Sequence, residues 1–143
     1  MIDGTPAAGD TVELHAVGGE FLGIGFYNPR SLIAVRLVSR VNRDIDRAFF
    51  QEKIAAAAAY RAAVYPGFDS LRLVFGESDG LPGLIIDKYG QYLAVQFLSA
   101  GMERRKDDIV AAVRELLNPA GIIARNDSPL RALEGLEEST EVL

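Results

Sequence analysis

The spacing of apolar residues constrains the fold of this chain more than any other feature, because it changes in character near Asp44. Before that point, short apolar runs alternate with turn residues. They cover residues 11–17, 21–27 and 32–38. Such runs predict β-strands, and Gly18-Gly19 suits a hairpin turn that needs positive φ. Three strands leave open edges and little core, so we expect them to lean on the element that follows.

From Asp44 onward the apolar residues recur with a helical period. Asp44 or Asp46 is a suitable N-cap, and apolar side chains then return every three or four positions until about Tyr65. Pro66 directly afterwards predicts the end of the helix. We interpret this helix as the joint between two modules.

The rest of the chain predicts a second module that begins with three strands joined by short turns. These strands cover residues 71–75, 84–88 and 92–98. Three successive strands indicate an antiparallel meander. An amphipathic helix over 102–117 and a strand over 121–125 follow. The tail from Glu134 is acidic and is expected to be ordered only if something packs on it.

Together these patterns predict an α+β fold in three parts. The parts are an incomplete β module (1–43), a connecting helix (44–66) and a central α+β unit (67–143). In the central unit an antiparallel sheet is expected to pack against one amphipathic helix, in the order strand-strand-helix-strand-strand.

The residue composition excludes several kinds of chemistry. The chain has no cysteine and one histidine, which excludes disulfides, cysteine nucleophiles and metal clusters of thiolates or histidines. The longest apolar stretch, 54–60, is far shorter than the roughly 20 residues of a membrane helix, and no basic-then-apolar leader opens the sequence. We therefore expect a cytoplasmic protein that binds no membrane, no metal and no cofactor of its own.

The charged residues bear on nucleic-acid binding. A formal net charge of −5 argues against tight, sequence-independent binding to a nucleic-acid backbone, so any contact with RNA should be local. The densest positive run consists of Arg30, Arg36, Arg40, Arg43 and Arg47. Guanidinium groups suit phosphates and stacked bases, and an aromatic side chain beside them can stack an unpaired base. We predict RNA contacts at Tyr27, Arg30, Arg36 and Arg40; the alternative is a solvated strand edge and helix start.

The loop 76–83 concentrates glycines, a proline, a serine and carboxylates. Pro82-Gly83 fits the central positions of a type II turn, so turn formation explains these residue types. The alternative is a cleft lined by carboxylates, namely Glu77, Asp79 and Asp87. A carboxylate-based hydrolase would require these groups to face one another, which strand alternation gives no reason to expect.

Two other features suggest sites at first sight. Gly23-Ile24-Gly25 matches the start of a dinucleotide-binding loop, but the third glycine would fall at Asn28 and no helical pattern follows. His15 lies among apolar strand residues without partners for a metal or catalytic site. We predict a structural role for both.

Several segments resemble one family of proteins. The most specific is 76–90, and the others are 23–31, 33–36, 96–101 and 125–127, with Arg131 and Glu134-Gly135. Over nearly its whole length the chain resembles the SAM-dependent RNA cytosine-C5 methyltransferases that act on large-subunit ribosomal RNA. The resemblance implies a PUA-like domain, a central α+β domain and a C-terminal class I methyltransferase domain. The chain resembles the first two parts, truncated at both ends.

The resemblance also implies a chemistry that this chain lacks. A cysteine thiolate attacks C6 of cytosine and activates C5 for methylation by S-adenosylmethionine, and a chain without cysteine cannot take that step. We therefore predict an RNA-recognition fragment of a 23S rRNA methyltransferase that is inactive alone and binds ribosomal RNA and the missing methyltransferase domain. Candidates for docking that domain or shaping a substrate cleft are Glu77, Asp79, Asp87 and Arg131.

The alternative function is a protein–protein interaction or dimerisation module with an open sheet edge, and a homodimer is expected to be possible. Added salt separates the two functions. RNA binding weakens as salt is added, whereas hydrophobic or sheet-edge association does not.

Overall fold

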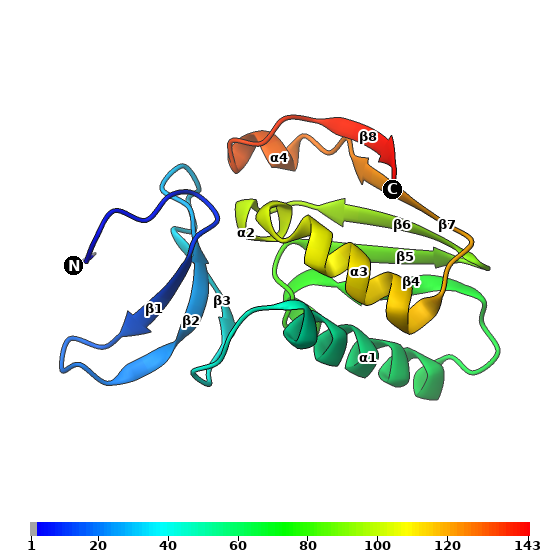
Figure 1. Ribbon diagram of the computed structural model, residues 1–143, viewed down its shortest axis with the longest axis horizontal. Coiled ribbons are helices and arrows are strands. Elements are labelled where there is room, and N and C mark those ends of the chain that lie inside the picture. The colour runs from blue at the N-terminus through cyan, green and yellow to red at the C-terminus, as the bar shows by residue number, and fades with distance from the viewer. Residues whose placement is uncertain (1–2) are drawn as a thin grey trace.

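The computed structural model describes residues 3–143, in which two β-sheets are joined by a helix (Figure 1). The first sheet is antiparallel, in the order β1 (Thr11–His15), β2 (Phe21–Tyr27) and β3 (Val35–Ser39). The three predicted strands are confirmed, although the third begins later than expected because the chain bends before it. Gly19 has a φ of 89° in the first turn, as the hairpin requires.

Helix α1 (Arg47–Val64) connects the two sheets, as predicted. Asp46 is its N-cap, and the carboxylate accepts a hydrogen bond from the Phe49 N–H at 3.0 Å. One face of the helix is buried through Phe49, Phe50 and Ile54. That face packs into the core of the second sheet and holds α1 against it.

The second sheet has five strands in the order β4-β5-β6-β7-β8. Their bounds are β4 (Ser70–Phe75), β5 (Leu84–Tyr89), β6 (Tyr92–Phe97), β7 (Gly121–Asn126) and β8 (Ser139–Val142). The antiparallel meander of β4, β5 and β6 is confirmed. β7 instead runs parallel to β6, because a helix returns the chain to the same end of the sheet, so the sheet is mixed. β8 orders the acidic tail by pairing with β7.

The amphipathic helix between β6 and β7 is divided in two. α2 (Ala100–Arg104) and α3 (Lys106–Leu117) are separated by Arg105, whose φ of −110° and ψ of 16° leave the helical region. Ser99 caps α2 by accepting from the Met102 N–H at 3.4 Å. A single helix was predicted, and the break turns α2 toward the first sheet while α3 stays on the second.

The loop between β4 and β5 forms the predicted turn. It opens with a 3₁₀ helix, η1 (Gly76–Asp79). The Leu81 carbonyl then accepts a hydrogen bond from the Leu84 N–H at 2.9 Å, and Gly83 has a φ of 85°. Proline followed by a glycine at positive φ is the pattern of a type II turn, so the turn interpretation of these residues is confirmed.

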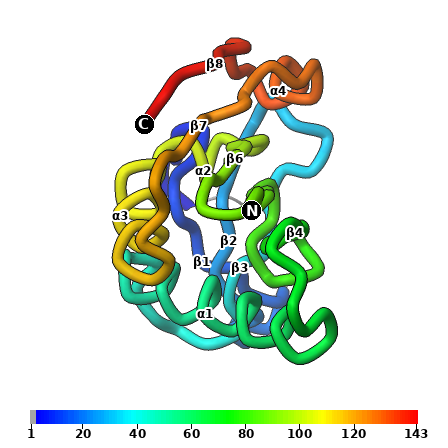
Figure 2. The backbone as a smooth tube through the Cα atoms, turned by 90° about the vertical axis from the view of Figure 1, so that its right-hand side faces the viewer, coloured from blue at the N-terminus to red at the C-terminus, as the bar shows by residue number. Residues whose placement is uncertain are grey.

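The second sheet is covered on one face only. α1 and α3 pack against each other and lie on the same side of the strands (Figure 2). The fully buried strand side chains beneath them include Phe97, Leu84, Ile86 and Val95, and α3 contributes Ile109 to the same core. In the described part of the chain the opposite face carries no helix of comparable length, so the central unit has two layers there rather than three.

The two sheets meet where β2 approaches α2. A Cβ at Gly101 would lie 2.1 Å from the Phe26 ring, so only glycine allows this approach. The Arg105 guanidinium lies 4.6 Å from the centroid of the same ring, and its Nη1 donates to the Gly9 carbonyl at 3.0 Å. The contact is therefore both apolar and polar. No helix within residues 3–143 is long and apolar enough to cross a membrane.

Candidate nucleic-acid interface

The five clustered arginines do not form one continuous surface. Arg43 pairs with Glu52 at 2.9 Å at the start of α1, and Arg47 pairs with Glu115 of α3 at 3.2 Å. The side chains of Arg43 and Arg47 therefore form ion pairs with glutamates of α1 and α3. The remaining three, which were predicted to contact RNA, differ from one another in direction and in partners.

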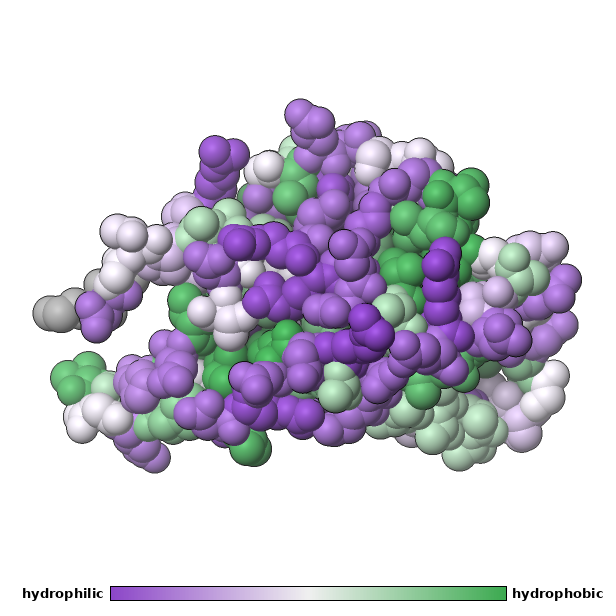
Figure 3. Space-filling model, viewed as in Figure 1, coloured by the Kyte–Doolittle hydropathy of each residue, from purple (hydrophilic) through white to green (hydrophobic). Residues whose placement is uncertain are grey.

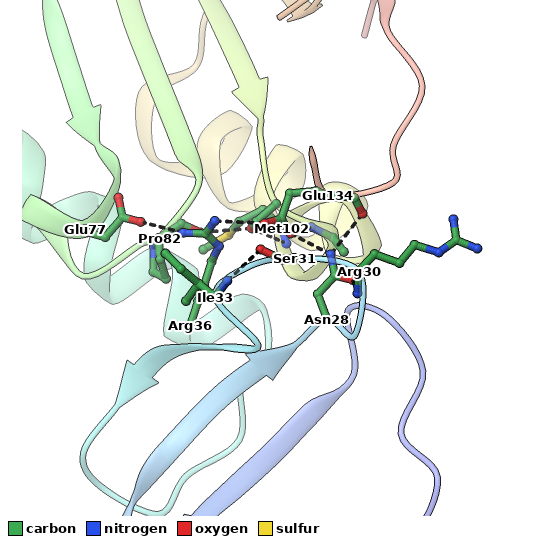
Figure 4. Close-up of polar contacts among 11 residues, drawn as sticks. Asn28, Arg30, Ser31, Ile33, Arg36, Glu77, Pro82, Met102 and Glu134 are labelled. Carbon is green, nitrogen blue, oxygen red and sulfur yellow. Dashed lines mark hydrogen bonds and ion pairs between the residues drawn. The ribbon is translucent and has the colours of Figure 1, made fainter. Parts of the chain in front are cut away.

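Arg36 lies on β3 and points into the junction between the two sheets (Figure 4). Its Nη2 donates to Glu134 Oε1 at 2.9 Å, and its Nη1 donates to Glu77 Oε1 at 3.3 Å. The side chain is 22% exposed. Arg36 was predicted to contact RNA on an open strip, but its guanidinium is held by two carboxylates of the second unit. These two ion pairs fasten β3 to that unit.

Glu134 is the centre of this junction. Its carboxylate is 4% exposed and accepts from Asn28 Nδ2 at 2.8 Å and from the Ala100 N–H at 3.3 Å, besides Arg36. Asn28 Nδ2 also donates to the Glu134 carbonyl at 3.0 Å. The segment after β2, the start of α2 and the end of α4 (Leu130–Leu133) are thus joined through one carboxylate.

The environment of Glu134 favours its charged form. Burial by itself would raise the pKa of this carboxyl. Hydrogen bonds from Ser31, Arg36, Asn28 and the Ala100 N–H outweigh burial and lower the pKa below 4.5. The junction therefore holds a full negative charge at neutral pH, matched by Arg36.

Arg30 and Arg40 are the arginines that stay available to a ligand. Both are exposed, and neither forms an ion pair with any residue from 3 to 143. The Arg30 side chain extends away from the junction in Figure 4, and its stem passes over Gly135. Guanidinium groups without an acidic partner are the ones able to pair with phosphates.

Tyr27 ends β2 and is half-buried. It borders a hollow of about 1200 Å³ on the outer face of the first sheet, which Leu14 and Val35 also line. Its neighbour Phe26 is buried against α2. Alternation along β2 therefore leaves Tyr27 as the aromatic that a ligand can reach.

Asp79 was predicted to line a cleft or to dock another domain. Its two oxygens instead accept from both terminal nitrogens of Arg61 at 2.6 and 2.7 Å, and one of them also accepts from the Phe75 N–H at 2.6 Å. The pair is mostly buried. Asp79 therefore clamps the η1 loop to α1, because a bidentate arginine contact fixes both groups.

The other two loop and strand carboxylates also have arginine partners. Asp87 accepts from Arg72 at 2.8 and 3.0 Å, while Glu77 is largely exposed and pairs with Arg36. Each carboxylate, Asp79 included, is thus held by a different arginine. The three do not converge on one cavity, so the geometry offers no acid–base pair for a hydrolase.

Arg131 was predicted to dock another domain or to shape a substrate cleft, but its side chain is buried among residues of the second sheet and its helices. It donates to the Phe97 carbonyl, to Glu103 Oε2 at 2.8 Å and to the Glu137 carbonyl at 2.8 Å. These contacts hold α4 and the tail against β6 and α2. The side chain is not presented to a partner, and the docking hypothesis for Arg131 lacks support from its position.

Sequence reasoning did not find the junction as a site. Neither Asn28 nor Glu134 was predicted as a site residue, and they are separated by 106 positions in the chain. Nothing in the local sequence shows that a glutamate in an acidic, turn-rich tail becomes buried against an arginine of β3. Within the described residues, no group of three or more histidine, aspartate or glutamate side chains could hold a metal ion.

Comparisons with known proteins agree with this architecture. Residues 1–40 match the family of PUA-like domains. The chain is 39% identical over 144 residues to Ribosomal RNA large subunit methyltransferase I of Vibrio vulnificus strain CMCP6. It is 42% identical over 145 residues to the protein of that name from Aliivibrio fischeri strain MJ11. Each alignment covers 99% of this chain, which spans 36% and 37% of these relatives.

A solved structure has the same fold. A candidate SAM-dependent methyltransferase from Streptococcus mutans superposes with a TM-score of 0.76 at 19% identity, over 85% of this chain and 33% of that one. At this identity the likeness concerns the fold alone.

Proposed function

We propose that this chain is the RNA-recognition portion of a SAM-dependent 23S rRNA (cytosine-C5) methyltransferase. The reason is that its homologues are large-subunit ribosomal RNA methyltransferases with a PUA-like domain. The observation that carries the proposal is the match to such proteins over 99% of the chain. The exposed Arg30 and Arg40, which form no ion pair within residues 3–143, supply groups that suit an RNA backbone.

The chemistry of methyl transfer is proposed to reside in the part of the relatives that this chain does not match. Methylation at C5 of cytosine needs a thiolate to attack C6, and the chain has no cysteine. The residues present do not fit S-adenosylmethionine either. Gly23 and Gly25 lie inside β2, and a Cβ at either would lie 2.5 Å from a side chain of β3. These glycines permit close packing and form no cofactor loop at a helix N-terminus.

The chain's own residues would then bind and orient the RNA. Arg30 and Arg40 contact phosphates, and Tyr27 stacks an unpaired base at the end of β2. The junction around Glu134 keeps these groups at a fixed distance from the second unit. Rigid placement matters because a target base must reach a reacting centre within a fraction of an ångström.

The parts of the chain divide this work in the proposal. Residues 1–43 form the PUA-like contact region, 44–66 the joint, and 67–143 the unit that docks the methyltransferase portion. Among the docking candidates Glu77 is the exposed one, whereas Asp79 and Arg131 are buried in internal contacts. Docking of the catalytic portion is therefore proposed near Glu77.

The test is a fluorescence-anisotropy titration of the full chain with a hairpin from large-subunit ribosomal RNA at low and moderate salt. The variant Arg30→Glu/Arg40→Glu should bind more weakly and reduce the salt slope by about one for each arginine removed from a phosphate. Arg114→Glu, in the last turn of α3, is a control that changes one exposed arginine in the same way.

Arg36→Glu is a poorer test, because it would place three carboxylates together at the junction and disturb the fold. Absence of salt-dependent binding by the unaltered chain would overturn the proposal. The double variant changes the net charge by four and Arg114→Glu by two, so a loss of binding free energy in Arg114→Glu half as large as in the double variant would show that the arginines act through net charge alone.

A further inference from the structure

The face of the second sheet opposite α1 and α3 has an unusual surface. Strand residues alternate between faces, so the neighbours of the buried Ile86 and Val95 point away from the helices. Tyr89 and Tyr92 are direct cross-strand partners on this helix-free face and are 59% and 55% exposed. Phe75, at the other end of β4, is 52% exposed.

These aromatics are accompanied by arginines whose orientation is fixed. Arg72 lies with its guanidinium 5.2 Å from the Phe75 ring centroid while its nitrogens donate to Asp87. Arg125 on β7 donates to both oxygens of Asp127, at 3.2 and 2.8 Å. A guanidinium held in one plane beside an aromatic ring offers a ready stacking surface.

Tyr89 lies beside Arg72, since both line one hollow of the second sheet together with Asp87. The hydrogen bond to Asp87 raises the pKa of Arg72, and the hydrogen bond to Asp127 raises the pKa of Arg125. Gly121 of β7 pairs with Tyr92, so strand alternation places Arg125 on the same face as Tyr92. The two tyrosines and the two arginines therefore belong to one face of the sheet.

We propose that this helix-free face binds single-stranded RNA, with the Tyr89 and Tyr92 rings stacking unpaired bases. The proposal rests on the proposed function and extends it, since it gives the second unit an RNA contact separate from Arg30 and Arg40. Every base has a π-face, so exposed aromatics on an open sheet bind single strands with little regard to sequence.

The charged pairs named on this face balance one another. Both aspartates there are matched by an arginine, whereas the chain as a whole carries a formal charge of −5. Figure 3 shows the other side, on which the helices lie, and hydrophilic side chains cover most of it. α3 exposes Asp107 there, whereas its Glu115 is paired with Arg47. A polyanion would meet less repulsion on the helix-free face than along α3.

The helix-free face also continues into the candidate interface. Glu77 follows Phe75 by two positions and accepts from Arg36 at 3.3 Å. The Phe75 end of the sheet therefore adjoins the junction, from which the Arg30 side chain extends. One RNA strand could pass from the arginines of the first unit onto the aromatics of the second without crossing the helices.

The experiment compares tyrosine variants in binding a labelled single-stranded oligouridine of about ten nucleotides. Tyr89→Ala/Tyr92→Ala should weaken binding at least about tenfold and leave the salt slope unchanged, because stacking but no phosphate contact is removed. Tyr89→Phe/Tyr92→Phe should retain most of the affinity, because the rings remain. Tyr60→Ala is the matched control, since that side chain is 61% exposed on α1.

The outcomes separate this inference from the proposed function. If the alanine pair binds as well as the unaltered chain while Arg30→Glu/Arg40→Glu fails, the helix-free face is not an RNA site but the proposed function survives. If the unaltered chain binds neither hairpin nor oligouridine, both fall. If the alanine pair changes the sedimentation coefficient rather than RNA affinity, the face is a protein interface. Thermal melting of the alanine pair, compared with that of the phenylalanine pair and the unaltered chain, separates a loss of binding from an altered fold of the sheet.

Discussion

The two sheets of this chain are held together in different ways. The five-stranded sheet buries a continuous apolar core beneath α1 and α3, with Phe97, Leu84 and Ile86 fully enclosed. The three-stranded sheet places Ile24 and Phe26 against that core, while its outer face lines a hollow of about 1200 Å³. Apolar burial dominates stability, so the first sheet depends on its contacts with the second far more than the reverse.

The largest effect should come from the core of the five-stranded sheet. Phe97→Ala removes a fully buried ring and should lower the free energy of unfolding by about 3–5 kcal/mol. Both sheets should lose order together, because the first rests on the second. Urea unfolding followed by far-UV circular dichroism measures this. Independent survival of β1 to β3 in the variant would contradict the dependence inferred here.

A smaller and local effect is expected at Gly101. Gly101→Ala places a Cβ within 2.1 Å of the Phe26 ring and should cost about 1–3 kcal/mol, although alanine favours a helix more than glycine does. Amide hydrogen exchange should quicken in β1 to β3 and stay slow in β5 and β6. Gly18→Ala is the control, since nothing lies within 4 Å of a Cβ there. Uniform quickening across both sheets would show that they form one cooperative unit.

The junction carboxylate should give an effect that depends on pH. Glu134→Gln removes the charge that Arg36 and Asn28 contact and should cost about 1.5–2 kcal/mol at pH 7. The folded pKa of Glu134 lies below its ordinary value of 4.5, so its contribution is present above about pH 4.5. It is lost as the pH falls through the folded pKa.

Urea midpoints measured between pH 7 and pH 3 test this dependence. The gap between the unaltered chain and Glu134→Gln should narrow as the pH falls, because protonation removes the same charge. Glu138→Gln changes an exposed glutamate of the same tail and should leave the midpoint unchanged at pH 7. A gap that stays constant down to pH 3 would mean that the charge of Glu134 is not what holds the junction.

The sequence was informative wherever a structure is decided locally. Strand alternation, the helix N-cap and the Pro82-Gly83 turn each depend on neighbours within a few positions. All were predicted, the cap as Asp44 or Asp46, of which the structure has Asp46. The parallel pairing of β7 with β6 was missed, because strand direction depends on the path of the chain between them. The break at Arg105 was missed for a similar reason, since that residue turns to meet Phe26 on another element.

The candidate site was less accessible to sequence reasoning. The sequence of a strand does not show whether an arginine faces solvent or a buried carboxylate. The different surroundings of Arg36 and Arg40 could therefore not be predicted from their spacing. The difference arises from Glu134, which lies 98 positions away from Arg36. The pairing of Asp79 with Arg61 and of Asp87 with Arg72 was likewise overlooked.

The smallest change in stability is expected at Arg40. This small change, set against the change in RNA affinity, separates Arg40 from Arg36. Arg40 is exposed and has no acidic partner within residues 3–143, so Arg40→Gln should alter the free energy of unfolding by no more than about 0.5 kcal/mol. Its affinity for the ribosomal RNA hairpin should nevertheless fall, because a phosphate contact is lost. Thermal melting and anisotropy on the same preparation measure both quantities. A loss of stability with unchanged affinity would assign Arg40 to the fold, like Arg36, and leave Arg30 as the arginine of the first sheet that is free to contact RNA.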